Sequence, residues 1–578
     1  MSESTFRRNS VPTLTSRLLT TIAQRVVLPG YAKQFDRFHA SLSHGRRIQH
    51  GMLFTWLQRC RDSRFGRDHG FATIQNLDDY RRQVPVSRCD YFAPYIDGVA
   101  RGIHTDLFPA NEPVKRFTIT TGSTGIPKLN PVTPTWLKYY RAAWNMWGAK
   151  MLLDHYPIVG RKILHIIGSW DMGKTAAGIP ISMVSALLAR NQNPVVRPFY
   201  CVPNDVTNIA DPDSRYYTML RLCMSTNIGL IVVMNPGTLL RLAQLGDEHR
   251  ESLIRDIRDG TLSTKFDIPA PIRQQISHRI RRADPACAKS LEQAVEESGH
   301  LYPKHYWDRP LIACWLGGTA GYQAKYLPEY FGDAPMRDQG LVSSEGRHTI
   351  PIEDGKPQGV LAINSAFYEF IPVTEDGDHP TVLEGHELRD GSDYHLVMTT
   401  YSGYFRFRIG DVVRCHGLIG ETPILEFLQK GDRCGDLEGE KVTEHQFLEA
   451  ATNAAHERGI RLGPVTAVPC RPDRRQPRYQ IIVEYGDIPD IEVARGFLAN
   501  VDERLRASNF LYKARRREKV LGPPTLWRIP TGGWSRFVDS EIERRGTGDA
   551  HYKHAALVQD STILDRFQPM DQIELASE

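Results

Sequence analysis

Apolar positions along the chain separate a helical beginning from an α/β middle and a later region dense in strands. Up to about residue 100 the apolar residues recur at helical spacing, with arginine-rich polar faces between Gln34 and Arg82. Pro85 and Pro94 then predict an irregular stretch. This pattern indicates a layer of helices at the amino-terminal end.

From about residue 115 onward, short β-rich runs alternate with longer helical segments. The β-rich runs are Lys115–Thr120, Ile163–Ile167, Ile228–Val233 and Leu311–Leu316, and the helical segments include Pro134–Leu153 and Ser214–Met224. Such alternation is typical of α/β proteins. We therefore expect a largely parallel sheet in the middle of the chain.

Past Gln358 the β-rich runs come closer together and predict an added sheet, antiparallel or barrel-like. They are Val360–Asn364, Phe367–Ile371, His395–Thr400, Phe405–Ile409 and Ile424–Leu428. At Gln429–Glu440 the pattern gives way to Gly, Asp and charge, and a helix, Glu444–Arg458, and a strand, Gln480–Tyr485, follow. The prediction is an α/β protein with a large N-terminal domain, residues 1–430, made of several subdomains with mixed sheets and flanking helices. A smaller, mobile α+β C-terminal domain, residues 431–578, follows it.

Composition narrows the class of protein. The 578 residues are 41% hydrophobic and 24% charged, as in ordinary globular proteins. With 72 Lys and Arg against 67 Asp and Glu the net charge is only +5, which does not indicate a nucleic-acid partner. The longest strongly apolar run, Ile228–Met234, is too short to span a bilayer, so we expect no membrane partner.

Cysteine usage favours a reducing compartment. The nine cysteines are odd in number, scattered, and nowhere spaced as a metal-binding pair. We therefore predict a cytoplasmic protein. No feature of the sequence indicates an oligomeric state.

The segment Phe117–Lys128 has the chemistry of a polyphosphate-binding loop. It leaves an apolar strand and enters a loop with four hydroxyl residues and two glycines that ends in Lys128. The hydroxyl residues and glycines are Thr120, Thr121, Gly122, Ser123, Thr124 and Gly125. Glycines let backbone N–H groups approach phosphate oxygens, and charge-assisted bonds contribute about 1.5–3 kcal/mol each. The alternative is an ordinary Ser/Thr/Gly turn between a strand and a helix.

A second segment, Gly168–Thr175, fits the nucleoside-triphosphatase pattern G-x-x-x-x-G-K-T. That motif requires a helix that starts at its lysine and points its amino terminus at the phosphates. Gly178 and Pro180 fall where the first turns of this helix would lie, so we expect no helix there. Lys174 is therefore predicted to be a loop residue.

Several segments resemble one enzyme family in order along almost the whole chain. The loop Thr120–Lys128 is similar to the signature of the adenylate-forming superfamily. The segments Val342-Ser-Ser-Glu345, Val360–Pro372, Thr399–Val412, Glu440-Lys-Val-Thr-Glu444, Asn509–Lys513 and His551-Tyr-Lys553 resemble the Gretchen Hagen family of acyl-acid amido synthetases. Such enzymes use ATP and Mg²⁺ to join a small carboxylic acid to an amine, usually an amino acid.

The resemblance implies roles for particular residues. It implies that Ser123, Thr124 and Lys128 hold the β- and γ-phosphates, that Ser344 contributes to nucleotide binding, and that Glu345 binds the magnesium ion. Asp411 matches the aspartate that accepts the ribose hydroxyls, placed at a strand end. Lys441 matches a lysine that reaches the α-phosphate, and Lys553 one that enters the site for adenylation. Taken without the resemblance, each of these two lysines is an ordinary surface residue.

The match has departures from the plant pattern. Thr120, Thr121 and Pro127 are closer to the wider superfamily, Val342 stands where an aromatic residue is usual, and His551 replaces a glutamine. The expected ATP chemistry is unaffected, but the resemblance does not identify a plant hormone as the substrate of this chain.

We expect the acyl group to bind between the helix Thr135–Leu153 and the stretch Gly317–Tyr322. The aromatic residues of that helix, Tyr139, Tyr140, Trp144 and Trp147, are equally well explained by core packing. Two other functions stay open. One is an acyl-CoA synthetase that uses a thiol acceptor, and the other is a catalytically idle ligand-binding relative.

Overall fold

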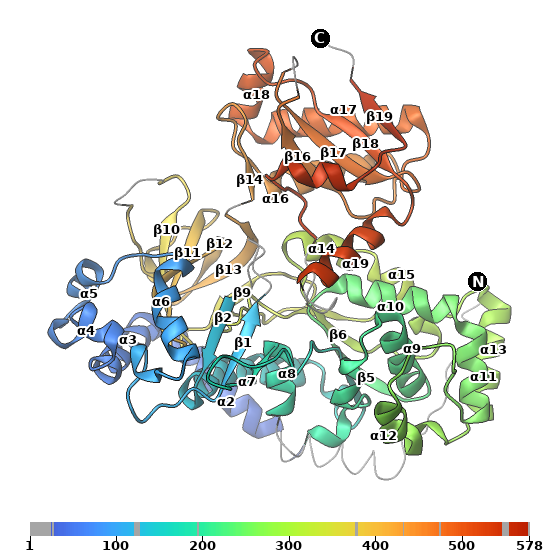
Figure 1. The fold of residues 1–578 in the computed structure, drawn as a ribbon, viewed down its shortest axis with the longest axis horizontal. Coiled ribbons are helices and arrows are strands. Elements are labelled where there is room, and N and C mark those ends of the chain that lie inside the picture. Colours follow the sequence, from blue (N-terminus) through green and yellow to red (C-terminus); the bar gives the residue numbers. More distant parts are fainter. Residues whose placement is uncertain are drawn as a thin grey trace.

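The computed structural model describes Arg25 and residues 28–120, 128–192, 196–375, 380–431, 433–472, 476–545 and 554–575. In Figure 1 they form a broad body and a smaller part, coloured orange to red, that stands on it. The body ends with β13 (Thr422–Lys430), and the C-terminal part begins with β14 (Cys434–Gly435). The domain boundary after residue 430 stays a prediction.

A layer of helices covers one end of the body, as the sequence predicts. These helices are α2 (Leu28–Ser41), α3 (Gly45–Cys60), α4 (Arg64–Asp68), α5 (Leu77–Gln83) and α6 (Cys89–Ala100). The irregular stretch expected at Pro94 is wrong, because Pro94 lies inside α6. A proline there removes one helical hydrogen bond, but α6 buries Phe92, Ile96 and Val99 in the body core.

The predicted parallel sheet is confirmed. Its four strands are β3 (Lys162–His165), β5 (Ile228–Val232), β6 (Leu311–Cys314) and β7 (Met336–Asp338), and all its pairs are parallel. Both β5 and β6 are buried along their whole length, which explains their unbroken apolar sequence. Helices on the right of Figure 1 pack against this sheet. They include α9 (Pro212–Cys223), α10 (Pro236–Glu248), α11 (Arg250–Asp259), α12 (Ala270–Ile280) and α13 (Pro285–Ser298).

A small sheet carries the predicted phosphate loop. In it β1 (Arg116–Thr120) pairs antiparallel with β2 (Lys128–Val132) and parallel with β4 (Ile181–Ser182). The long helix α7 (Pro134–Asp154) follows β2 directly. Its start is fixed by Thr133, whose side chain accepts a hydrogen bond from Trp136 N, and by Pro134 in the first turn.

The later strands form an antiparallel sheet of six. The order is β10-β11-β12-β13-β9-β8, with bounds Thr349–Ile350 (β8), Gly359–Leu361 (β9), Phe367–Pro372 (β10), Asp393–Thr400 (β11) and Tyr404–Ile419 (β12). The short strand expected at Phe405–Ile409 is wrong in length, because β12 continues through Gly410 and Asp411. Gly410 has a φ of 86°, a conformation that favours glycine and lets the strand bend without ending.

The C-terminal part has an α+β fold with its own apolar core. Its sheet has the order β16 (Thr466–Cys470), β17 (Arg478–Glu484), β18 (Thr525–Ile529) and β19 (Asp571–Glu574). Its helices are α16 (Glu444–Glu457), α17 (Ile491–Ser508), α18 (Phe510–Arg517) and α19 (Gly533–Arg545). A short pair, β14 with β15 (Val442–Thr443), lies between the body and this sheet.

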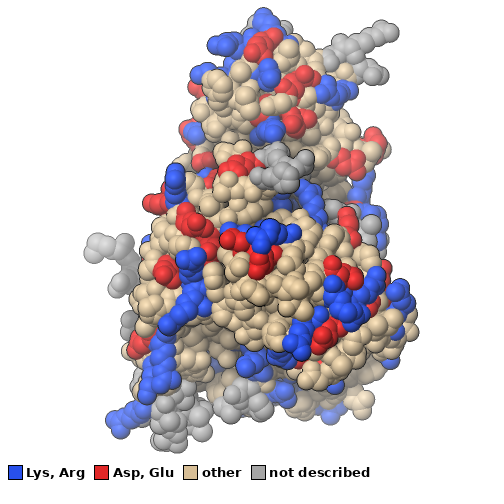
Figure 2. Space-filling view, turned by 90° about the vertical axis from the view of Figure 1, so that its left-hand side faces the viewer, with Lys and Arg blue, Asp and Glu red and all other residues tan. Residues whose placement is uncertain are grey.

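None of the helices in the described ranges is both long enough and apolar enough to cross a membrane. On the face shown in Figure 2, acidic and basic side chains lie next to one another in several places.

Candidate functional site

The two strands that border the predicted phosphate loop are in place. Thr120, the last residue of β1, pairs with Lys128, the first residue of β2. Residues 121–127 lie outside the described residues, and with them Thr121, Gly122, Ser123, Thr124 and Gly125. Their phosphate-binding roles therefore remain predictions. The loop joins two strands, not the strand and helix of an ordinary phosphate loop.

The competing segment Gly168–Thr175 is a structural turn. Lys174 forms an antiparallel bridge with Pro180, and Gly173 O accepts a hydrogen bond from Ile181 N at 2.9 Å. The next helix, α8, starts only at Val184, which confirms that no helix begins at Lys174. Trp170 of this segment packs against two guanidinium groups. The geometry does not suit a triphosphate.

The loop that carries Ser344 and Glu345 is held tightly against the small sheet and α7. Asn130 Nδ2 on β2 donates to Ser344 O at 2.9 Å, and Trp136 Nε1 on α7 donates to Glu345 O at 2.9 Å. Both bonds are buried. They fix the position of Glu345 relative to the strand on which Lys128 lies.

Glu345 and Asp411 form a pair of buried carboxylates. Glu345 is 7% exposed and Asp411 is 3% exposed. Burial raises the pKa of Glu345, and Asp411 raises it further, while Ser343 and Lys430 lower it. Each carboxylate is therefore within electrostatic reach of the other. The expected position of Asp411 at a strand end is wrong, because it lies within β12.

Lys430 is a site residue that the motifs do not reveal. It pairs with Asp411 across β12 and β13, and its Nζ forms an ion pair with the Asp411 carboxylate. The side chain of Lys430 is 29% exposed, whereas that of Asp411 is 4% exposed. The ammonium thus compensates a carboxylate that would otherwise be buried without a counter-charge.

The donor set fits Mg²⁺ and a nucleotide. Magnesium prefers carboxylate oxygens, which Glu345 offers, and Asp411 supplies an acceptor for hydroxyl groups. Burial disfavours the charged form of Glu345 and raises its pKa, and a bound divalent cation would compensate that charge. The ion pair with Lys430 engages Asp411 Oδ1, so the other carboxylate oxygen can still accept a ligand hydroxyl.

Buried hydrogen bonds hold the backbone around Lys441 in the C-terminal part. Its φ is 48°, which is uncommon for a lysine. The preceding Glu440 is fully buried and accepts from Leu437 N at 2.9 Å and Tyr479 Oη at 2.5 Å. Asn509 Nδ2 donates to Glu440 O and to Lys441 O, so tertiary contacts hold this backbone. The charge of Lys441 acts on the Cys434 thiol, whose pKa burial raises and Lys441 lowers.

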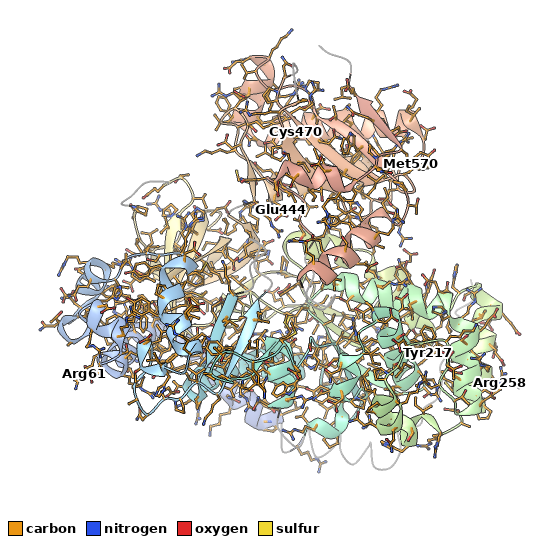
Figure 3. The ribbon with its side chains drawn as sticks, in the orientation of Figure 1. Arg61, Tyr217, Arg258, Glu444, Cys470 and Met570 are labelled. Atoms are coloured by element: carbon orange, nitrogen blue, oxygen red, sulfur yellow. The ribbon has the colours of Figure 1, made fainter. Side chains whose placement is uncertain are left out.

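Lys553 lies outside the described residues, but the chain that follows it is anchored. His554 Nε2 lies 2.9 Å from Thr466 Oγ1 and 3.2 Å from Val465 O. Ala556 N donates to Glu444 Oε1 at 2.7 Å. Glu444 is labelled in Figure 3, where it lies at the base of the C-terminal part.

The same edge of the C-terminal part docks on the body. Leu462 O accepts hydrogen bonds from Tyr322 Oη at 2.7 Å and Tyr326 Oη at 2.9 Å. Arg461 forms an ion pair of 2.8 Å with Glu329. Tyr322 belongs to α14 (Gly318–Ala324) and Glu329 to α15 (Leu327–Phe331).

The aromatic residues of α7 are mainly core residues. Trp147 is buried and donates from Nε1 to Asp338 O at 2.9 Å. Tyr139 packs edge-on against Trp56 with ring centroids 4.9 Å apart. Tyr140 is also buried, whereas Trp144 is half-buried. Core packing therefore explains Tyr139 and Trp147.

Comparisons with known proteins give a consistent match. Residues 34–336 match the GH3 family N-terminal domain, residues 359–430 the GH3 family central domain, and residues 445–562 the GH3 family C-terminal domain. The indole-3-acetic acid-amido synthetase GH3.3 of Arabidopsis thaliana is 23% identical over 548 residues, which cover 90% of each chain. The indole-3-acetic acid-amido synthetase GH3.15 of the same plant is 25% identical over 548 residues, covering 88% of this chain and 89% of that protein. The solved structure of GH3.15 acyl acid amido synthetase aligns with a TM-score of 0.80 at 21% identity, covering 93% of this chain and 95% of that one.

Proposed function

The chain belongs to the GH3 family, and from that premise we propose that it is an acyl-acid amido synthetase. It activates a carboxylic acid with ATP as the acyl-adenylate and transfers the acyl group to an amine, by default an amino acid. The observation that carries the proposal is the buried Glu345–Asp411 pair with Lys430, next to the strands that border the loop Thr120–Lys128. We do not propose indole-3-acetic acid, the acid in the names of the relatives, as the substrate of this chain.

The proposed nucleotide site consists of the loop Thr120–Lys128 and the carboxylates Glu345 and Asp411. The phosphates are bound by Lys128, which supplies a positive charge, and by the loop residues Thr120, Thr121, Gly122, Ser123, Thr124 and Gly125. Asp411 accepts hydrogen bonds from the ribose hydroxyls, and Ser344 lies beside Glu345 at the same site. Glu345 would hold Mg²⁺, and the bound ion would supply positive charge to the phosphate oxygens.

In the first step, an oxygen of the substrate carboxylate attacks the α-phosphorus of ATP and pyrophosphate leaves. Lys128 stabilises the negative charge that develops on the leaving pyrophosphate, while Asp411 holds the ribose so that attack is in line. In the second step, the amine nitrogen attacks the acyl carbon, AMP leaves, and the amine loses its proton. No protein nucleophile takes part in either step.

The two steps require different surroundings at the α-phosphate. We assign the change to a C-terminal domain, residues 431–578, that moves relative to an N-terminal domain, residues 1–430. Lys553 serves adenylation, and Lys441, near the hinge, reaches the α-phosphate. Glu345 and Asp411 are buried, and charge interactions are stronger in a buried site than in water. We place the reaction in the cytoplasm.

The test is acid-dependent exchange of labelled pyrophosphate into ATP, measured over a library of carboxylic acids. Wild-type enzyme should exchange only when its acid is present, and Glu345→Gln should lower the rate by about 100-fold, since it removes a charge that holds Mg²⁺. The mutant should recover in part at high Mg²⁺. Exchange that does not depend on any acid would refute the proposal. Coenzyme A in place of the amine tests for a thiol acceptor.

A further inference from the structure

Arg347 is a buried cation that the proposed chemistry does not use. It follows Glu345 by two residues and its side chain is 0% exposed. The guanidinium carbon lies 5.0 Å from the ring centroid of Trp144 and 4.8 Å from that of Trp147. A guanidinium keeps its charge at neutral pH.

The contacts of this guanidinium are incomplete. Nη2 donates to Gln339 O, but among the described residues no acceptor lies within hydrogen-bond reach of Arg347 Nε or Nη1. The hydroxyl of Tyr140 is equally buried and has no hydrogen-bond partner in the described chain. Tyr140 lies four residues before Trp144 on α7, so its side chain is on the same helix face as the two rings that contact Arg347. Buried polar groups are paired in more than nine cases in ten, and a charged one left without partners is costly.

Asp338, an acidic neighbour of Arg347, does not accept a hydrogen bond from it. Asp338 uses its two carboxylate oxygens to accept from Leu316 N and Gly340 N, each at 2.5 Å. Burial also raises the pKa of Asp338 to about 7, so it carries only part of a charge at neutral pH. Arg347 therefore has more positive charge and more N–H donors than the described chain compensates.

The position of Arg347 suits contact with the acyl substrate. Asp338 is the last residue of β7, and Gln339 follows it, so the cluster lies at the carboxyl end of the parallel sheet. Ligands bind at this edge in α/β folds. Two residues of chain span at most about 7 Å, which keeps Arg347 close to Glu345, where the reacting carboxylate is proposed to lie.

We propose that Arg347 and Tyr140 recognise a second carboxylate on the acyl substrate, so that the preferred substrates are dicarboxylic acids. This inference rests on the proposed function for the identity of the reacting carboxylate. A guanidinium and a phenol are both donors, and together they match an oxyanion. The rings of Trp144 and Trp147 exclude water from that contact, which strengthens it.

The test compares matched acids that differ only in the second carboxylate. Benzoate is paired with isophthalate and terephthalate, and hexanoate with adipate, and kcat/KM for pyrophosphate exchange is measured for each. In at least one pair the wild-type enzyme should have a higher kcat/KM for the diacid than for the matched monoacid. Arg347→Met should lower this ratio of kcat/KM values, diacid over monoacid, by about 10- to 100-fold. Tyr140→Phe should lower it less, because the guanidinium remains. A ratio within one enzyme cancels any loss of folded protein.

Arg221→Met is the matched control. Arg221 is also buried, but its Nε and Nη2 donate to Thr261 O and Ile280 O, both at 2.9 Å. Its loss should lower thermal stability and leave the diacid ratio unchanged. An unchanged ratio in Arg347→Met, or a wild-type enzyme without diacid preference, would overturn the inference.

A binding measurement without ATP tests the carboxylate site independently of the proposed reaction. The rise in Tm with each acid is measured without ATP, because a bound ligand stabilises the folded state. A larger rise with a diacid that depends on Arg347, seen without any pyrophosphate exchange, would reject the proposed reaction but support the carboxylate site. Equal rises with both acids of every pair would overturn the site.

Discussion

Removing the two tyrosine hydroxyls that hold the C-terminal part on the body should weaken adenylation more than amide formation. The double variant Tyr322→Phe, Tyr326→Phe deletes both hydrogen bonds to Leu462 O. This docked edge continues into Val465 and Thr466, which hold His554, the residue that follows Lys553 in the chain. We therefore predict that the docked arrangement is the one that serves adenylation.

The magnitude follows from the contacts. A typical hydrogen bond contributes about 0.5–1.5 kcal/mol net, so two contribute about 1–3 kcal/mol. The ion pair of Arg461 with Glu329 remains, but its side chains are 55% and 41% exposed, and such pairs contribute at most about 1 kcal/mol. A loss of about 2 kcal/mol shifts the balance between docked and undocked states by roughly 30-fold.

Two assays check this prediction. Pyrophosphate exchange reports adenylation, and preformed acyl-adenylate with an amine reports the second step. Small-angle scattering should show a larger mean radius for the double variant. Tyr217→Phe is the control, since Tyr217 Oη donates to Asp256 Oδ2 at 2.7 Å inside the body, in the region labelled in Figure 3. Equal losses in both half-reactions, with an unchanged scattering profile, would refute the reasoning.

Three further predictions concern single residues. Lys128→Ala should lower adenylate formation by about 100-fold, and Lys174→Ala much less, as pyrophosphate exchange will show; a larger loss at Lys174 would revive the competing loop. Lys553→Ala should impair pyrophosphate exchange but form amide from preformed adenylate near the wild-type rate, unless the lysine is permanently in the site. Burial raises the pKa of Asp338 from 3.8 to about 7, so the folded state keeps a proton that the unfolded chain releases near pH 4. As the pH rises from about 4 to about 7, the free energy of unfolding should therefore fall by about 1.4 kcal/mol per pH unit. Urea titrations of Asp338→Asn should lack this contribution. If the free energy of the variant fell with pH as steeply as that of the wild type, Asp338 would not have a raised pKa.

Local patterns predicted most of the elements of this fold. The helix expected at Pro134–Leu153 is observed as Pro134–Asp154, because Thr133 and Pro134 mark its start in the sequence itself. Fully apolar strands such as Ile228–Val232 were also predictable, since burial on both faces leaves a continuous apolar run. The helix through Pro94 was not, because tertiary burial outweighs the local cost of the proline.

Site residues were predictable from the sequence only where they lie within a recognisable motif. Glu345 and Asp411 are recognisable within motifs, but Lys430 belongs to no motif. Its pairing with Asp411 follows from the hairpin that turns at Gly420, so counting outward from that turn would have found it. The contacts of Leu462 with Tyr322 and Tyr326 join residues more than 130 positions apart, and no local pattern encodes them.

The central claim is that ATP is cleaved between its α- and β-phosphates to activate an acid for transfer to an amine. The most direct measurement is product analysis with purified wild-type enzyme, ATP, Mg²⁺, an accepted acid and an amino acid. One AMP and one pyrophosphate should appear for each amide formed. ADP and phosphate in equal amounts would contradict the claim.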